Sequence, residues 1–406
     1  MTRLLESFSR DIYRRAKATF RTASLGLERT GAGLHYALNI PFPERSDERH
    51  LRETLGWLCR AQDVGADEGV SALFDPRSGW DASYPETSGY IVATFLAAAD
   101  FLKNDLYVER ARRIGDWEIA VQAPNGGVYS RLGKSDLRVF NTGQVILGWS
   151  ALFERTGDER YLDAAKRAGD YLLRIQESDG TWRQDTYCGP RTYHARTDWG
   201  LLRLSKLADD ERYADAAKRN LAWVMAQQQD NGWFRNCGFD DSPPITHLID
   251  YTFIGILESA ILAPALFNQS PAECIRGGAS AICEIVKTTS VEGIEGLIPG
   301  SFGSSWKSND RYSCLTGNAQ LGYTLLRLYG LTQDTNYELA AGKLISGVKR
   351  TQIVGGREDG VRGAIAGCFP VYAGYLAGAY PNWAAKFFAD ALLASMNRKM
   401  PFVVAA

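Results

Sequence analysis

Two histidines, each followed by an acidic residue at helical spacing, are the side chains of this sequence best suited to moving protons. His247 precedes Asp250 and Tyr251 by three and four positions, and His194 precedes Asp198 by four. Residues at these intervals share one face of a helix, so each imidazole can lie beside a carboxylate that orients it and raises its basicity. Both groups therefore suit general acid–base chemistry, with helix capping or stabilising pairing as the alternative.

A third group surrounds an acid at the start of an apolar segment. Glu86 opens that segment, where a carboxylate also stabilises the helix N-terminus. Around it the sequence gathers aromatic and acidic side chains, namely Trp80, Asp81, Tyr84 and Tyr90. As the general acid of a glycoside hydrolase, Glu86 would need a second carboxylate, for which Asp198 and Asp250 are the candidates.

A repeat in the sequence indicates the elements that hold these residues. Four segments carry a tyrosine and, fifteen residues later, a glutamine with glycine close behind; they span residues 107–122, 161–176, 213–228 and 337–352. Their apolar residues recur at steps of three and four, so each segment is predicted to be an amphipathic helix with one face in water. A fixed interval of this kind is typical of a helical repeat.

Segments of a different character lie between these surface helices. They are apolar nearly all round, which predicts buried helices, at residues 87–102, 142–155, 194–207, 247–262, 315–329 and 365–380. With two further surface segments at 48–62 and 270–287, six helix pairs result. Six such pairs close naturally into a ring, so the predicted fold is all-α, an (α/α)6 toroid of six inner and six outer helices.

The predicted toroid forms one domain, residues 48–400, preceded by an N-terminal basic amphipathic arm, residues 1–47. Residues 1–30 hold seven Lys and Arg against three Asp and Glu, with apolar residues at helical spacing. This arm could contact a membrane surface or a protein partner, or pack on the ring.

Composition excludes several classes of protein. Lys plus Arg number 46 and Asp plus Glu 47, which argues against nucleic acid as a main partner. The seven cysteines include no Cys-x-x-Cys pair and do not form a disulfide or zinc-binding pattern. This favours a reducing compartment, the cytoplasm. The N-terminal arm could still bring the protein to a membrane surface. No phosphate loop, dinucleotide fingerprint or metal-binding histidine motif is present, so we predict no cofactor and no metal.

The loops before the inner helices rim the mouth of a toroid, and loops on a rigid scaffold are where function concentrates. These loops carry aromatic rings, amides and a few charges. Such a surface suits pyranose rings, which present C–H faces and hydroxyl edges. The candidate substrate-binding residues are Arg196, Arg191, Trp80, Tyr84, Tyr90, Asn141, Gln144, Trp199, Asn318 and Tyr372.

The rim residues resemble those of α/α-toroid enzymes that act on uronic-acid polysaccharides, and this resemblance implies removal of the C5 proton of a uronic acid. Arg196 or Arg191 could neutralise the adjacent carboxylate and stabilise the enolate-like state. His247 or Tyr251 could take the proton, and His194 or Tyr193 could return one or protonate a leaving oxygen. We therefore predict a carbohydrate-active enzyme on a uronic-acid-containing polysaccharide, either a lyase or a uronyl C-5 epimerase.

Three resemblances accompany this interpretation. The Gln-x-x-x-Gly-x-Trp stretch at 176–182 resembles the glutamine-tryptophan repeats of squalene cyclases and the protein-prenyltransferase superfamily. This resemblance extends to the fold. The acidic motifs of those enzymes are absent from this sequence, so a terpenoid cyclase is less favoured. The rim residues resemble those of toroid lyases, epimerases and unsaturated glucuronyl hydrolases acting on uronic-acid polysaccharides. Residues 84–90, 246–252 and 314–320 resemble toroid proteins linked to bacterial exopolysaccharide production, which implies a role in exopolysaccharide metabolism.

Two other functions stay open from the sequence. One is a glycoside hydrolase that uses Glu86 with Asp198 or Asp250. The other is a non-catalytic glycan-binding or scaffold component of a polysaccharide-synthesis assembly, docked through residues 1–30. Fold alone does not choose among them.

Overall fold

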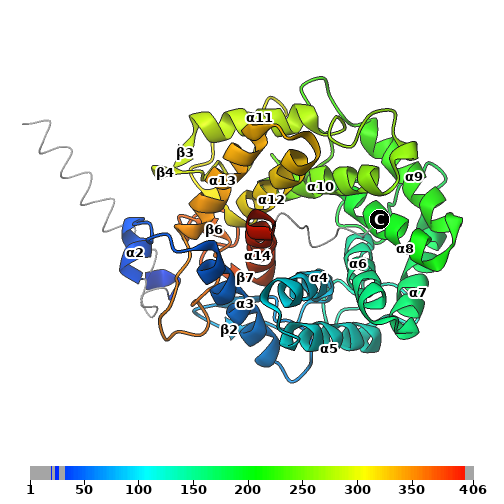
Figure 1. Cartoon of the computed structure of the whole chain (residues 1–406), viewed down its shortest axis with the longest axis horizontal. Helices are drawn as coiled ribbons and strands as arrows, with labels where there is room; N and C mark the ends of the chain where they lie inside the picture. Colours follow the sequence, from blue (N-terminus) through cyan, green and yellow to red (C-terminus); the bar gives the residue numbers. More distant parts are fainter. Residues whose placement is uncertain (1–19, 21–22, 27–32, 398–406) are drawn as a thin grey trace, which may run out of the picture.

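The computed structural model describes residue 20 and residues 23–26 and 33–397, and helices within this part of the chain form two concentric rings (Figure 1). The six inner helices are α4 (Pro85–Leu102), α6 (Val139–Thr156), α8 (Ala195–Ala208), α10 (Thr246–Leu262), α12 (Leu315–Thr332) and α14 (Asn382–Asn397). Each packs against the next, and α14 packs against α4, which closes the ring. The predicted all-α, (α/α)6 toroid is confirmed.

The outer ring, among the described residues, holds the six amphipathic helices. They are α3 (Asp47–Asp63), α5 (Leu106–Val121), α7 (Glu159–Ile175), α9 (Glu211–Met225), α11 (Arg276–Thr288) and α13 (Thr335–Lys349). Several begin with the same device: Asp158, Asp210 and Asp334 each accept a hydrogen bond from the backbone N–H two residues on. This satisfies a backbone donor that the first helical turn leaves unpaired. A short helix, α2 (Gly33–Leu38), precedes the ring.

The repeated glutamine and glycine join neighbouring outer helices. The Gln122 amide donates to the Gly126 carbonyl at 2.9 Å and to the Ala164 carbonyl of α7 at 3.1 Å. Gln176 repeats the arrangement one unit later, with the Gly180 carbonyl at 2.9 Å and the Ala216 carbonyl of α9 at 2.8 Å. The interval found in the sequence therefore reflects a contact between one repeat and the next.

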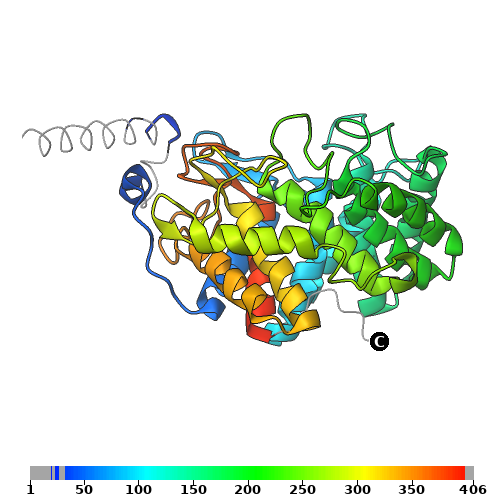
Figure 2. The same cartoon turned by 90° about the horizontal axis from the view of Figure 1, so that it is seen from above.

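Long loops precede the inner helices and gather on one face of the ring, while the opposite face has mostly short connections (Figure 2). The strands lie in these loops and all pair antiparallel. They are β1 (Leu73–Asp75) between β2 (Gly79–Trp80) and β7 (Tyr380–Pro381), β3 (Ser290–Val291) with β4 (Ile294–Glu295), and β5 (Ser313–Cys314) with β6 (Cys368–Phe369). The β1–β7 pair ties the first rim loop to the last.

One predicted inner helix is wrong. Residues 365–380 form a rim loop with β6 at its start and β7 at its end, and the sixth inner helix is α14, further along the chain. Pro370 lacks the N–H that a helix interior requires, and Gly374 and Gly378 adopt positive φ. The segment is apolar because it is largely buried between neighbouring loops, not because it is helical.

The remaining sequence predictions for the fold have mixed outcomes. Outer helix α11 begins six residues later than the predicted 270–287 segment. The predicted basic arm lies mostly outside the described residues, and the division into an arm and one toroid domain stays a prediction. No helix of the described residues is long and apolar enough to span a bilayer.

Candidate active site

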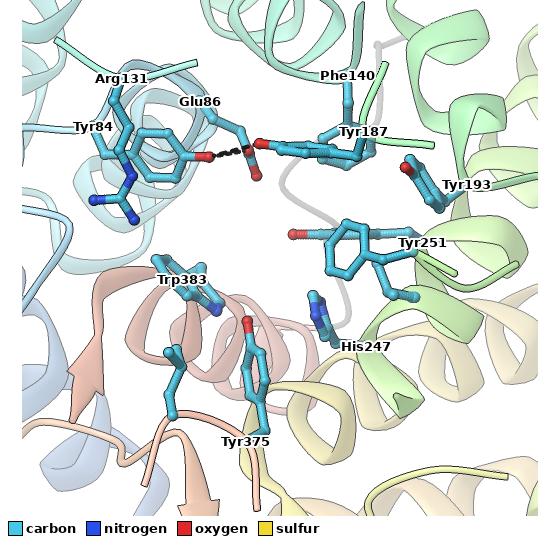
Figure 3. Close-up of a pocket in the computed structure, with 13 residues that line it drawn as sticks. Tyr84, Glu86, Arg131, Phe140, Tyr187, Tyr193, His247, Tyr251, Tyr375 and Trp383 are labelled. Atoms are coloured by element: carbon cyan, nitrogen blue, oxygen red, sulfur yellow. Dashed lines mark hydrogen bonds between the residues drawn. The ribbon is translucent and has the colours of Figure 1, made fainter. Parts of the chain in front are cut away.

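A cavity of about 210 Å³ opens at the mouth of the inner ring, on the face that carries the long loops. We call it the mouth cavity. Aromatic side chains dominate its wall (Figure 3). Its lining residues are Tyr84, Glu86, Arg131, Phe140, Tyr187, Tyr193, Phe239, His247, Leu248, Tyr251, Tyr375, Leu376 and Trp383.

Glu86 supplies the carboxyl group of the mouth cavity. It lies in the first turn of α4, directly after the proline that starts the helix, and it is 9% exposed. The Tyr84 hydroxyl donates to it at 2.7 Å. Burial raises the pKa of Glu86 to about 7, although the Tyr84 hydrogen bond and the charges of Arg196 and Arg131 oppose the shift. A carboxyl group with this pKa can give or take a proton near neutral pH.

Two rim residues extend the surroundings of Glu86. The Tyr187 hydroxyl lies 3.2 Å from that of Tyr84. The Arg131 guanidinium lies 5.4 Å from the Tyr84 ring centroid and pairs with Asp81 at 3.2 Å. Arg131 is the arginine among the residues that line the mouth cavity, and about half of its side chain is exposed. It is therefore placed to meet an anionic group of a ligand.

His247 occupies a different wall of the mouth cavity, on the first turn of α10 (Figure 3). Its ring lies against Tyr251 and Tyr375, with centroids 5.3 and 5.1 Å away. Neither ring nitrogen has a hydrogen-bond partner among the described residues. Burial lowers the pKa of His247 to about 3. The imidazole is therefore neutral at physiological pH, and one of its nitrogens is available to accept a proton.

Two tyrosines present hydroxyl groups near this histidine. Tyr251 follows His247 by one helical turn on α10, and Tyr193 lies in the short 3-10 helix Thr192–His194. Burial raises the pKa of both phenols well above their usual value. Both hydroxyl groups therefore keep their protons and act as donors rather than bases. The Tyr193 hydroxyl has no partner among the described residues.

Arg196 lies beneath the mouth cavity rather than in its lining. Its guanidinium is buried, bonds the Gln144 side-chain oxygen and lies 5.4 Å from the Tyr251 ring centroid. The rings of Tyr90 and Trp199 lie 5.6 and 5.4 Å away. Four of the predicted substrate-binding residues thus form one buried cluster that supports Tyr251 from behind.

Some of the predicted catalytic residues line the mouth cavity and others do not. Glu86, Tyr193, His247 and Tyr251 come together in the mouth cavity, whereas His194, Asp198 and Asp250 do not line it. Asp198 is turned toward the outer ring and accepts from the Asn220 amide of α9 at 2.6 Å. His194 lies in the 3-10 turn before α8 rather than in that helix, so the four-residue interval did not make Asp198 its partner.

His194 and Asp250 are also buried. Burial, helped by the charge of Arg191, lowers the pKa of His194 to about 3, and its ring packs edge-on against Trp182 at 6.0 Å. Burial raises the pKa of Asp250 to about 7. Among the described residues, no group of three or more His, Cys, Asp and Glu is arranged to hold a metal ion.

Of the predicted substrate-binding residues, Tyr84 alone lines the mouth cavity. Trp80 packs on Trp57 at 5.2 Å, and Asn318 donates to the Gly296 carbonyl at 2.6 Å. Asn141 donates to the Tyr129 carbonyl at 3.1 Å. The Tyr372 hydroxyl accepts from Asn39 at 3.0 Å, and Arg191 lines a different cavity.

Several lining residues were not predicted. They are Arg131, Phe140, Tyr187, Phe239, Leu248, Tyr375, Leu376 and Trp383. Tyr187 and Phe239 belong to rim loops that the sequence had already singled out, so their place before an inner helix was the available signal. Trp383 was missed because the sixth inner helix was placed too early in the chain.

Comparisons with known proteins agree with the fold described above. Residues 141–201, from α6 into α8, match the family described as pectic acid lyase. A probable mannosyl-oligosaccharide alpha-1,2-mannosidase 1B from Neosartorya fischeri is 30% identical over 96 residues. That match covers 20% of this chain and only 20% of the mannosidase. Both matches cover only a small part of this chain.

Solved structures match over nearly the whole chain. The unsaturated glucuronyl hydrolase of Bacillus sp. GL1, described as responsible for the degradation of glycosaminoglycan, aligns with a TM-score of 0.67 at 14% identity, covering 87% of this chain and 97% of that structure. Cellobiose 2-epimerase from Bacillus thermoamylovorans aligns with a TM-score of 0.67 at 12% identity, covering 84% and 97%. The chain shares the α/α-toroid fold of these carbohydrate-active enzymes. Because the sequence identities are only 14% and 12%, the structural similarity shows a shared fold and nothing more.

Proposed function

We propose that this toroid is a carbohydrate-active enzyme that removes the C5 proton of a uronic-acid unit in a polysaccharide, as a lyase or a uronyl epimerase. The observation that carries the proposal is His247. Its imidazole is neutral, lines an aromatic cavity and has both nitrogens free of partners among the described residues. A protonatable carboxyl group, Glu86, occupies another wall.

The proposed reaction begins with a pyranose ring held among the aromatic side chains of the mouth cavity. Arg131 neutralises the C6 carboxylate, which makes the adjacent C5 proton more acidic. His247 accepts that proton, and the C–H electron pair moves toward the carboxylate to give an enolate-like state. The buried imidazole gains basicity once an anionic substrate lies beside it, because a nearby negative charge favours the protonated form.

The second step separates the two branches. In a lyase, the electrons form the C4–C5 double bond, the C4–O bond breaks, and Glu86 gives its proton to the leaving oxygen. In an epimerase, Glu86 or Tyr193 returns a proton to the opposite face of C5. The resemblance of residues 84–90, 246–252 and 314–320 to exopolysaccharide-linked toroid proteins supports a role in exopolysaccharide metabolism as part of this proposal.

Glycoside hydrolysis is the second candidate, and the protonated state of Glu86 favours it. A general acid of a glycosidase needs a pKa raised toward neutrality, which burial gives Glu86. The hydrolytic pair predicted from the sequence is less well supported, because Asp198 bonds Asn220 and neither Asp198 nor Asp250 lines the mouth cavity. Hydrolysis with water activated by His247 is the form that this site would allow.

Substitution of the two proton-transfer groups tests the proposal. With a uronic-acid polysaccharide that the wild type turns over, His247→Asn and Glu86→Gln are each expected to lower kcat by about 10²- to 10⁴-fold. The exposed Arg357→Gln serves as a control. Unchanged turnover in both variants would remove this mechanism. A new reducing end without an unsaturated or epimerised product would favour the hydrolase.

A further inference from the structure

A second cavity, of about 310 Å³, lies in the rim beside the mouth cavity. Its lining comes from three successive rim loops: Arg191 before α8, most of residues 233–244 before α10, and Gly303 with Ser304 before α12. The two cavities are neighbours. Phe239 belongs to the same loop and Tyr193 follows Arg191 by two residues, and these rings, 5.9 Å apart, line the mouth cavity.

Arg191 is an unusual member of this second cavity. Its residue is 7% exposed, and its Nε is buried without a partner. Its guanidinium makes no hydrogen bond or ion pair with the residues that the structure describes. A guanidinium carries its charge at every physiological pH, and burying an unpaired charge is costly. Its position in a cavity wall indicates that its counter-charge comes from a ligand.

The nearby acids do not take that role within the fold. Asp240 lines the same cavity, but hydrogen bonds from the Ser242 side chain and then from the Ser242 backbone N–H, at 2.8 Å, are the main causes of its lowered pKa. The charge of Arg191 contributes to this lowering only as a lesser influence. Arg191 and Asp240 therefore interact at a distance and leave the guanidinium donors open.

The rest of the lining fits a sugar rather than a bare ion. Trp233 offers a ring, held edge-on by Trp306 at a centroid distance of 5.0 Å. Asp241 and Asn236 bring a carboxylate and an amide that can bond hydroxyl groups. A planar guanidinium matches a carboxylate with two parallel hydrogen bonds.

We propose that the second cavity is an outer subsite for an acidic sugar unit, with its carboxylate bound by Arg191. The sugar belongs to the same chain whose reacting unit fills the mouth cavity, so this inference rests on the proposed function for the identity of the substrate. It implies that the enzyme selects acidic polysaccharides at a unit other than the one on which it acts.

Kinetics with oligomers of increasing length test this subsite. KM is measured for uronic-acid oligomers of two to six units, with the wild type, Arg191→Gln, Arg191→Lys and the exposed-arginine control Arg357→Gln. The wild type and the control are expected to show a fall in KM once the oligomer reaches the second cavity. Arg191→Gln should raise KM for the longer oligomers by about tenfold, the effect of roughly 1.4 kcal/mol, and Arg191→Lys by less. If KM depends on oligomer length in Arg191→Gln as it does in the wild type, the proposed subsite is wrong.

A binding experiment separates failure of the subsite from failure of the proposed function. Calorimetry on the wild type and Arg191→Gln compares a uronic-acid hexamer, the same hexamer with reduced carboxyl groups, and inorganic sulfate. A preference for the acidic hexamer that disappears in Arg191→Gln supports the subsite even where no turnover occurs. Equal binding of acidic and reduced hexamers, or sulfate binding as tightly as the acidic hexamer, would overturn it.

Thermal unfolding of the ligand-free protein tests the unpaired state of Arg191 separately. Removing a buried charge that lacks a partner should leave the melting temperature of Arg191→Gln unchanged or higher. A lower melting temperature would show that the guanidinium has a partner within the fold, and would contradict the proposal.

Discussion

Burial sets the protonation states of the two groups proposed to move protons. Glu86 keeps its proton up to about neutral pH, and His247 remains without one down to about pH 3. Both therefore enter the reaction uncharged, one as a donor and the other as an acceptor. If the two side chains were exposed to solvent, their charges would be the opposite at pH 5 to 6. An exposed glutamate is ionised in this range, and an exposed histidine is largely protonated.

The raised pKa of Glu86 predicts a pH-dependent cost in stability. The unfolded chain releases this proton near the ordinary value of 4.5, whereas the folded protein holds it until about 7. The carboxyl group therefore lowers the stability of the fold as pH rises through this window, by about 3 kcal/mol once above pH 7. Glu86→Gln should be more stable than the wild type at pH 8 and equal to it at pH 4. Urea unfolding at both pH values checks this, and an equal difference at both would contradict it.

The same two groups predict the pH profile of activity. If Glu86 acts as the acid, kcat/KM should fall above about pH 7 as it ionises. His247 should add no loss near pH 6.5, the usual pKa of histidine, because burial lowers its pKa to about 3. Rate measurements from pH 5 to 9 check both limbs. A loss of kcat/KM centred near pH 6.5 on the acid side would count against His247 as the buried base.

Residue spacing predicted part of the site. Glu86 and His247 were found because they lie in the first turns of inner helices, and Tyr251 because it follows His247 by one turn. Asp198 was misplaced because an interval of four residues fixes a shared helix face without fixing where it points. The unpaired state of Arg191 was not predictable either, because it depends on loops that meet only in the folded ring.

At the scale of elements, hydrophobic patterning predicted the outer helices and five of the six inner helices that the structure describes, but it assigned the sixth inner helix to a loop and missed α14. Outer helices alternate between buried and exposed faces, whereas inner helices are buried all round, and both patterns are plain in the sequence. The rim loop at 365–380 is buried too, so its composition resembles that of an inner helix. Pro370 was the signal against a helix there.

Two glycines with similar backbone conformations allow a matched test of the contact between repeats. Gly126 and Gly133 have φ of +93° and +73°. A Cβ at Gly126 would lie 2.1 Å from the Arg167 carbonyl oxygen of α7, whereas one at Gly133 would meet nothing within 4 Å. Gly133→Ala should cost about 1 kcal/mol for its conformation alone, and Gly126→Ala about 3 kcal/mol or more. Denaturant unfolding of both variants measures the difference; equal losses would show that α7 does not constrain the loop.

For the whole molecule, closure of the ring depends on contacts between the first and last helices. The Gln352 amide, just after α13, donates to the Thr54 hydroxyl of α3 and to the Gly363 carbonyl, both at 2.8 Å. Its side-chain oxygen lies 2.5 Å from His50 Nδ1. In the inner ring, the Thr94 hydroxyl of α4 donates to Asp390 of α14 at 2.7 Å. The bonds from Gln352 to Thr54 and His50, and from Thr94 to Asp390, join residues about three hundred positions apart.

Loss of the Gln352 contacts should destabilise the closed ring. Gln352→Ala leaves His50 Nδ1 and the Gly363 carbonyl unsatisfied, while the Thr54 hydroxyl keeps its bond to the His50 carbonyl. Each unsatisfied group costs about 1 kcal/mol or more, so a loss of about 2 kcal/mol or more is expected. The exposed Gln333 lies in the turn between α12 and α13, and Gln333→Ala should change stability by less than about 0.5 kcal/mol. Chemical denaturation of the two variants gives the comparison. A loss in Gln352→Ala no larger than in the control would show that this junction does not hold the ring closed.

The reaction proposed for this toroid is removal of a proton from C5 of a uronic-acid unit. The most direct test incubates the protein with a panel of uronic-acid polysaccharides in deuterated water and follows the products by NMR and ultraviolet absorbance. We expect either deuterium at C5, which identifies an epimerase, or a new C4–C5 double bond, which identifies a lyase. Either signal should be absent in His247→Asn. Cleavage of the polymer that leaves C5 protonated and creates only a new reducing end, or binding of the polymer with neither signal, would contradict the account.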